Sequence, residues 1–190
     1  MSFELKVALR TVILLVLLME ANWLASVIRG ERLAAQLALS EAALIVPVAG
    51  VRADQLVDSW GAPRSGGRSH EGIDIGAPLG TPVRATTAGT IVKLHRSKLG
   101  GTTLYQLDAS GRLIFLYAHL KAYAAKLKAG DAVVKGQVLG YVGTTGNAKS
   151  PHLHFEIHQA NSDKQWWRGA SLNPYAALTS RRMEARLVRR

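Results

Sequence analysis

The sequence Gly143-Thr-Thr-Gly-Asn-Ala-Lys-Ser-Pro-His-Leu-His-Phe-Glu156 predicts a loop that leads directly into a β-strand. Successive side chains of a strand point to opposite faces, so residues two apart share a face. Leu153, Phe155 and Ile157 then lie on one face, which we expect to be buried. The polar residues lie on the other face: His152, His154, Glu156 and His158.

Histidines on one strand face can serve a metal centre in two ways. Both can bind the ion, or one can bind it while the other transfers a proton. A His-x-His pair alone is a weak signal, because surface histidines are common, so the pair needs partners elsewhere in the chain. The chain contains no cysteine. This excludes a disulfide framework and a thiolate zinc site, and leaves histidine and carboxylate as ligands.

The composition favours one β-rich domain with an appendage. The chain has 190 residues, enough to bury a core, and 18 of them are glycines, which suits short strands and tight turns. The net charge of +11 predicts an anionic partner, such as nucleic acid, lipid head groups or an acidic polymer. Charge alone does not choose among these.

The strand pattern predicts a mainly antiparallel sheet. Two apolar runs meet across Asp108–Gly111, which is the signature of a hairpin. The helices that would alternate with strands in a parallel sheet are absent from the pattern. The expected strands before the opening motif are Gly89–His95, Thr102–Leu107, Leu113–Leu120 and Gln137–Val142.

The N-terminus contains an apolar run, Thr11–Met19, preceded by basic residues. It fits the apolar core of a signal peptide or, extended to Ile28, a membrane anchor. Glu20 and Asn22 would then lie near the middle, and an acidic side chain there costs about 2.5–3.5 kcal/mol. No small-x-small cleavage site follows the run, so we favour an uncleaved anchor over residues 1–30. A buried core helix is the alternative.

Composition also divides the rest of the chain. Residues 31–45 have the alanines, leucines and charges of a short amphipathic helix, which we expect to be a stalk. From residue 46 to 178 the pattern is that of the β domain. Residues 179–190 form a basic tail with five arginines and one glutamate. This tail is either a solvated chain end or an electrostatic tether to anionic lipid or wall carboxylates.

Candidate partners for the histidine pair occur upstream. In His70-Glu-Gly-Ile-Asp74 the even separation places both ligand types on one strand face, and His119 lies at the end of a predicted strand. Each alone is more typical of a structural residue. Together, His70, Asp74 and His154 make a His₂Asp set that leaves one tetrahedral zinc position open, as catalytic sites do.

Such a centre would suit hydrolysis. A zinc ion lowers the pKa of water towards neutrality, and His119 and His152 remain as imidazoles that take a proton or stabilise an oxyanion. The expected substrate bond is an amide. A serine nucleophile is disfavoured because no Gly-x-Ser-x-Gly elbow occurs.

Three motifs in this order resemble those of the lysostaphin-type (LytM-like, M23) zinc metallopeptidases: His70-x-x-x-Asp74, Tyr117-Ala-His-Leu120 and His152-Leu-His-Phe-Glu156. The resemblance spans roughly residues 46–178. It implies a small antiparallel β-sheet domain with a substrate groove, a Zn²⁺ ion held by His70, Asp74 and His154, and catalytic roles for His119 and His152. The implied activity is endopeptidase cleavage of the peptide cross-links of peptidoglycan.

Two other functions are open alternatives. Some relatives that have lost zinc ligands activate separate cell-wall amidases, but here all five positions carry the family's residue types, which favours an enzyme. A nucleic-acid-binding β domain fits the charge but lacks the expected aromatic and basic strand pattern. We therefore expect no nucleic-acid partner.

The expected location follows from the substrate. It is the cell envelope, with the domain in the periplasm and the N-terminal segment in the cytoplasmic (inner) membrane. A regulatory protein partner is left open. His158 lies farther along the strand, so we expect its loss to matter little, with support of a metal ligand as the alternative.

Overall fold

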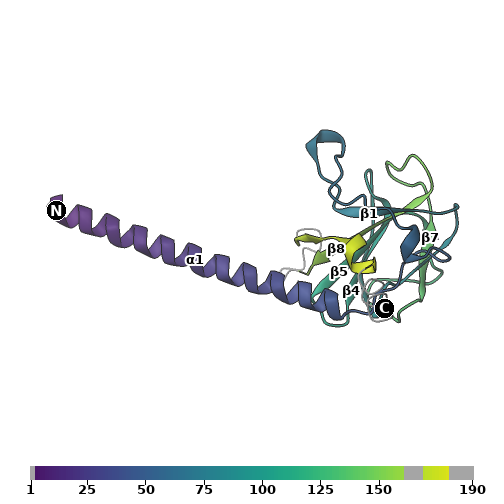
Figure 1. The fold of residues 1–190 in the computed structure, drawn as a ribbon, viewed down its shortest axis with the longest axis horizontal. Coiled ribbons are helices and arrows are strands. Elements are labelled where there is room, and N and C mark those ends of the chain that lie inside the picture. Colours follow the sequence, from purple (N-terminus) through teal and green to yellow (C-terminus); the bar gives the residue numbers. More distant parts are fainter. Residues whose placement is uncertain (1–2, 161–168, 180–190) are drawn as a thin grey trace, which may run out of the picture.

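The computed structural model describes residues 3–160 and 169–179. It contains a β domain from which one long helix projects (Figure 1). The predicted basic tail lies outside the described residues, except for Thr179.

Nine strands form one sheet within the described residues, and every pairing is antiparallel. The main order is β1-β8-β5-β4-β3-β6, while β7 pairs with β5 and β2, and β9 pairs with β8. The predicted antiparallel fold is confirmed. The strands are β1 (Gly72–Gly76), β2 (Pro82–Arg84), β3 (Gly89–Ser97), β4 (Gly101–Asp108), β5 (Leu113–Tyr123), β6 (Ala132–Val133), β7 (Val138–Val142), β8 (His152–Gln159) and β9 (Ser171–Leu172).

Short helical turns complete the domain. Two 3₁₀ helices, η1 (Ala53–Gln55) and η2 (Ser65–Gly67), precede β1. Residues 174–179 are helical, and the Asn173 side chain accepts hydrogen bonds from the first turn of this segment. The turns before β1 matter for function, because they bring polar groups against the residues that begin that strand.

Strand β8 lies between β1 and β5 and alternates as its sequence predicts. Leu153, Phe155 and Ile157 are fully buried on the core face. Phe155 packs against the rings of Phe115 and Tyr117 from the neighbouring strand β5. This apolar face fixes the register of β8, because a slip of one residue would turn its polar side chains into the core.

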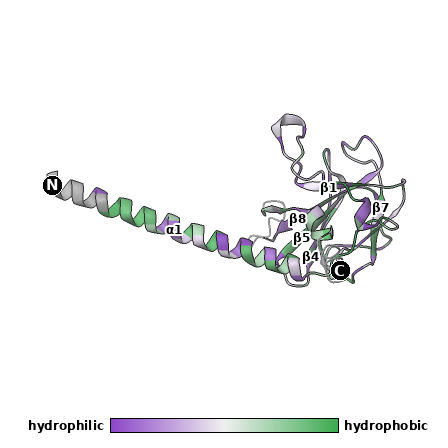
Figure 2. Cartoon of the chain, viewed as in Figure 1, coloured by the Kyte–Doolittle hydropathy of each residue, from purple (hydrophilic) through white to green (hydrophobic). Residues whose placement is uncertain are grey.

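The helix α1 (Phe3–Glu41) is continuous over 39 residues, about 58 Å at 1.5 Å per residue. The predicted anchor and stalk are therefore one helix, since no proline interrupts it and the single Gly30 is tolerated. Figure 2 shows its apolar stretch, which is exposed and is long and apolar enough to cross a membrane.

The last turns of α1 pack against the β domain. Ala35 and Ala38 are buried there, and their small side chains allow the helix to approach the domain closely. The chain that follows is hydrogen-bonded: the Ile45 amide donates to the Thr86 carbonyl at 3.0 Å, and the Thr86 hydroxyl donates to the Ile45 carbonyl at 2.6 Å. The C-terminal end of the helix is thus attached to the domain by packing and by hydrogen bonds.

Candidate metal centre

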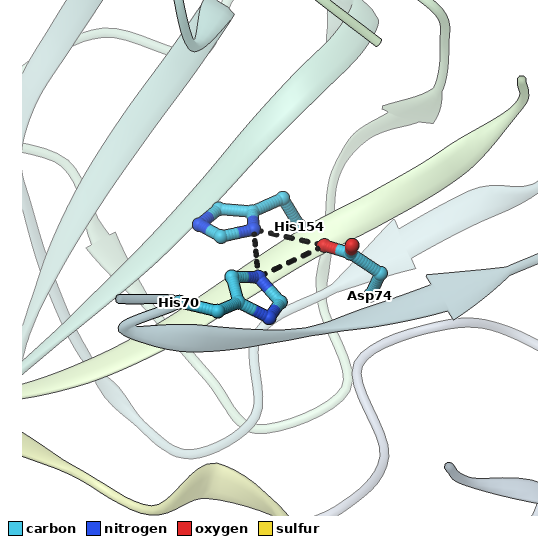
Figure 3. Close-up of side chains that lie close together, drawn as sticks. All are labelled: His70, Asp74 and His154. Atoms are coloured by element: carbon cyan, nitrogen blue, oxygen red, sulfur yellow. Dashed lines mark hydrogen bonds and ion pairs between the residues drawn. The ribbon is translucent and has the colours of Figure 1, made fainter. Parts of the chain in front are cut away.

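Strands β1 and β8 bring the three predicted ligands together (Figure 3). Asp74 on β1 pairs directly with His154 on β8, and His70 lies just before β1. His154 Nδ1 lies 2.9 Å from Asp74 Oδ1 and 3.0 Å from His70 Nε2. His70 Nε2 lies 3.2 Å from the same Asp74 oxygen. The three atoms face one point and form a candidate metal-binding group.

Ser59 orients this group from the segment after η1. His70 Nδ1 donates to the Ser59 carbonyl at 2.7 Å, which leaves the Nε2 lone pair facing the site. The Ser59 hydroxyl accepts from the Asp74 amide at 3.2 Å. Burial lowers the pKa of His70 despite this hydrogen bond and the nearby Asp74 carboxylate. His70 is therefore neutral at pH 7, as a metal ligand must be.

Arg64 holds the outer oxygen of Asp74. Its Nη2 donates to Asp74 Oδ2 from the loop before β1, while Asp74 Oδ1 faces the two histidines. Burial by itself raises the pKa of Asp74, but hydrogen bonds from His154 and Arg64 hold it well below its usual range. The carboxylate is thus ionised and offers one oxygen to the site.

His119 and His152 lie beside the candidate ligands. Their ring centroids are 4.9 Å apart, and the His119 ring is 5.7 Å from that of His154. His119 Nδ1 donates to the Thr145 carbonyl and His152 Nδ1 to the Ser150 carbonyl, both at 2.8 Å. A carbonyl only accepts, so Nδ1 of each ring carries a hydrogen, and the tautomer that this favours has its lone pair on Nε2. His152 Nε2 lies 3.8 Å from Asp74 Oδ1.

His119 reaches the site through an irregularity in β5. Its backbone has φ 61°, and the pairing of β5 with β4 shifts register beside it, as a β-bulge does. A Cβ on Gly143 would lie 2.2 Å from the Lys121 amide nitrogen, so only glycine fits next to this bulge. Left-handed backbone at a non-glycine residue is uncommon and concentrates at functional sites. Burial lowers the pKa of His119.

The polar face of β8 continues beyond His154. Glu156 Oε1 lies 2.6 Å from His154 Nε2, and Glu156 Oε2 lies 2.6 Å from His158 Nε2. Burial opposes the charged form of His154, but hydrogen bonds to Asp74 and Glu156 outweigh it and raise the pKa to about 9. Glu71, Glu156 and His158 are a second group with ligand atoms within 4.8 Å of one another, though two of its three members already bond each other.

Residues 68–174 match the profile of peptidase family M23. The chain belongs to this family. An L-Ala--D-Glu endopeptidase of Bacillus subtilis is 33% identical over 129 residues, which cover 63% of the chain and 38% of that relative. The peptidoglycan DD-endopeptidase ShyC of Vibrio cholerae is 36% identical over 90 residues, 47% of the chain and 20% of that relative. The chain thus spans less than half the length of either relative.

The fold of the β domain also resembles that of a solved structure. The catalytic domain of lysostaphin from Staphylococcus simulans superposes with a TM-score of 0.58 at 30% identity, covering 67% of this chain and 95% of that domain. Both relatives are endopeptidases, and the name of the Vibrio protein specifies peptidoglycan, so the chain belongs to a family that includes peptidoglycan-cleaving peptidases.

The structure brings all five predicted site residues close together. The sequence analysis did not predict the residues that hydrogen-bond to them. Ser59, Arg64 and Thr145 contribute a carbonyl, a guanidinium and a carbonyl to them. Ser59 and Thr145 contact the histidine rings through backbone carbonyls, which every residue has, so residue type gives no signal for these two contacts. Arg64 lies ten residues before Asp74 in a glycine-rich loop, where an arginine ordinarily indicates a solvated side chain.

Proposed function

We propose that the chain is a zinc-dependent endopeptidase that hydrolyses peptide cross-links of bacterial peptidoglycan. The observation that carries the proposal is the convergence of three ligand atoms beside two histidines whose Nδ1 atoms are hydrogen-bonded to backbone carbonyls. All five residues have the types and order that the resemblance to M23 enzymes requires. A catalytic role is therefore favoured over the alternative, activation of a separate wall amidase.

The donor set suits zinc. Two imidazoles and one carboxylate are ordinary zinc ligands, and three protein ligands leave a position open for catalysis. Tetrahedral ligands at about 2.0–2.1 Å from zinc lie roughly 3.3 Å from one another. The distances of 2.9, 3.0 and 3.2 Å among the three atoms are slightly shorter. Shifts of a few tenths of an ångström in the side chains of His70, Asp74 and His154 would therefore accommodate the ion.

The two remaining histidines suit proton transfer. Zinc, when bound, supplies a Lewis acid that polarises a carbonyl and acidifies water. His119 is neutral because burial lowers its pKa, so its Nε2 can accept a proton. Both rings are held by their Nδ1 atoms to backbone carbonyls, which fixes the direction in which Nε2 points. Either ring can thus take a proton from water or return one to the leaving amine.

The location of the enzyme is part of the proposal. Peptidoglycan lies outside the cytoplasmic membrane, so the β domain has to be exported to meet it. The exposed apolar stretch of α1 supports retention as an anchor in the inner membrane, with the domain in the periplasm. We expect the full-length protein in the membrane fraction, with its β domain accessible to protease added from the periplasmic side.

Digestion of isolated peptidoglycan tests the function. The full-length protein, loaded with one equivalent of zinc, should release fragments with new amino and carboxyl termini within the cross-linking peptides. A chelator should stop the release, and added zinc should restore it. Zinc-loaded protein that releases nothing alone but stimulates an added amidase would establish the activator function instead. Recovery of the protein from the cytosol, protected from external protease, would contradict both.

A further inference from the structure

His158 is a buried ionisable side chain that the proposed function does not use. It continues the polar face of β8, four residues beyond His154, and only 2% of its surface is exposed. A buried ring nitrogen without a partner is costly, because water cannot reach it. His158 has a partner on each side of its ring, and these partners connect it to the candidate metal centre.

Three short contacts make this connection. His158 Nδ1 lies 3.0 Å from the Gly169 carbonyl oxygen, and His158 Nε2 lies 2.6 Å from Glu156 Oε2. The other oxygen of the Glu156 carboxylate lies 2.6 Å from His154 Nε2. Residues two apart on a strand are about 6.6 Å apart, so Glu156 is placed midway between two histidines and can bond both. A continuous path therefore runs from the backbone of Gly169 to the ring of His154.

The direction of each hydrogen bond follows from its acceptor. The Gly169 carbonyl only accepts, so His158 Nδ1 donates. An ionised Glu156 also only accepts, so Nε2 of His158 and Nε2 of His154 both donate to it. A neutral His158 would turn a lone pair towards the carboxylate, which would repel it at 2.6 Å. His158 is therefore an imidazolium whose charge balances Glu156.

The ionisation behaviour agrees with this order. Burial opposes the charge on His158, but the hydrogen bond and charge of Glu156 outweigh it and raise the pKa of His158.

We propose that His158 is a positioning residue for the metal centre: by clamping Glu156, it fixes the His154 ring in the tautomer that presents Nδ1 to the metal. This inference rests on the proposed zinc site. A proton held on Nε2 leaves Nδ1 as the only nitrogen of a neutral His154 ring that can bind the ion. Without His158, the second oxygen of Glu156 loses its partner and the carboxylate can turn away from His154.

The backbone around Gly169 fixes the carbonyl that accepts the hydrogen bond from His158 Nδ1. A Cβ on Gly169 would lie 1.8 Å from the Gln159 carbonyl oxygen, so the backbone of Gly169 fits against β8 only as glycine. The Gln159 amide also donates to the Ala170 carbonyl at 2.9 Å. The Gly169 carbonyl is therefore held in place by its backbone neighbours, which gives His158 a fixed acceptor.

Zinc affinity of two His158 variants tests the proposal. In His158→Leu the donor to Glu156 is lost, and we expect the zinc Kd, measured by chelator competition with less than one equivalent of zinc, to rise about 10–100-fold. In His158→Gln the side-chain amide reaches about as far as Nε2 and keeps a donor, so the Kd should stay within about threefold of wild type. Imidazole ¹⁵N shifts of the metal-free proteins, recorded above pH 9 where the His154 ring is neutral, should show a single His154 tautomer in wild type and a mixture in His158→Leu.

A double-mutant cycle separates positioning from general destabilisation. Glu156→Gln should weaken zinc binding to a similar degree, and adding His158→Leu to it should cost little more, because His158 acts through Glu156. The matched control is Gln106→Leu, which removes another buried side chain with two hydrogen bonds, to Tyr117 and Thr87. It should lower the Tm without changing the zinc Kd.

Two results would overturn the proposal. One is an unchanged zinc Kd in a folded His158→Leu protein. The other is a full, additive loss when His158→Leu is combined with Glu156→Gln. Failure of the proposed function is seen separately, as wild-type protein that binds no zinc, or that binds zinc tightly and leaves peptidoglycan uncut.

Discussion

The two halves of the candidate site are built differently. His70, Asp74 and His154 lie on or next to two regularly paired strands, with Asp74 directly opposite His154. His119 lies instead on a bulge in β5, and His152 follows the loop that enters β8. In the first half the inward-facing atoms are within 3.2 Å of one another, whereas in the second each ring is hydrogen-bonded through Nδ1 to a backbone carbonyl.

This difference indicates a division of labour. Atoms that must bind one ion have to converge, and a regular antiparallel pair achieves this because opposite residues are close. Groups that move protons need a set direction and an accessible nitrogen, which the carbonyls of Thr145 and Ser150 provide. We expect the first half to control metal content and the second to control turnover.

Removal of a ligand should have the largest effect. His154→Ala takes the central group from the ligand half, so we expect loss of stoichiometric zinc and of all detectable hydrolysis while the β domain still folds. Metal analysis and far-UV circular dichroism check both parts. His95→Ala is the control, because His95 is exposed on β3. Full zinc content in folded His154→Ala protein would contradict the assignment.

Substitution in the other half should spare the metal. His119→Ala and His152→Ala should keep one equivalent of zinc and lower kcat by about 10²–10⁴-fold, the usual cost of a lost general acid–base group. Metal analysis and turnover on the same samples separate the two effects. Loss of zinc from either variant would show that this histidine contributes to metal binding, contrary to the proposed roles of the two halves.

Zinc binding should release a proton from the ligand half. In the metal-free protein the pKa of His154 is raised to about 9, so at pH 7.5 its ring is protonated and must lose a proton to bind the ion. His70 has a lowered pKa and contributes little. We expect release of about one proton and a zinc affinity that falls about tenfold per pH unit below pH 9.

Calorimetry in buffers of different ionisation enthalpy measures this release at pH 7.5 and again above pH 9, where it should approach zero. The apparent enthalpy of zinc binding should change with the buffer at the lower pH only. An enthalpy independent of buffer at pH 7.5 would show that His154 is already neutral in the metal-free protein.

Deletion of the basic tail should have the smallest effect on zinc binding and on turnover. Deleting residues 179–190 removes five arginines, each worth about 1 kcal/mol near an anionic surface, but no candidate site residue. Binding to anionic vesicles should weaken and become less sensitive to salt, while zinc content and hydrolysis stay unchanged. A deletion that lowers zinc affinity would show that the tail acts on the site.

Sequence predicted the regular parts better than the irregular ones. The alternation of β8 predicted its buried face, and even spacing predicted that His70 and Asp74 share a face. The pairing of Asp74 with His154 across β1 and β8 comes from the structure. The bulge that turns His119 into the site was not predicted, because it depends on register against β4 and on the close approach of Gly143. Periodicity carries no information on such non-local contacts.

The role of His158 was underestimated for a related reason. Its place in the alternation marks it as one more polar residue on the exposed side of β8, yet only 2% of its surface is exposed. The covering includes Gly169, which lies 11 residues farther along the sequence and whose carbonyl His158 contacts. A strand pattern shows which residues share a face but not whether another segment covers that face.

Because α1 is continuous, it connects the apolar stretch to the β domain as a rigid rod. Its exposed apolar stretch and the turns that carry buried Ala35 and Ala38 belong to one helix, with no joint between them. With the apolar stretch held in a bilayer, the helix would set the height and tilt of the β domain above the membrane. A flexible linker would leave both free to vary. On the rigid helix, the candidate metal centre would meet peptidoglycan only within a narrow range of distances from the membrane.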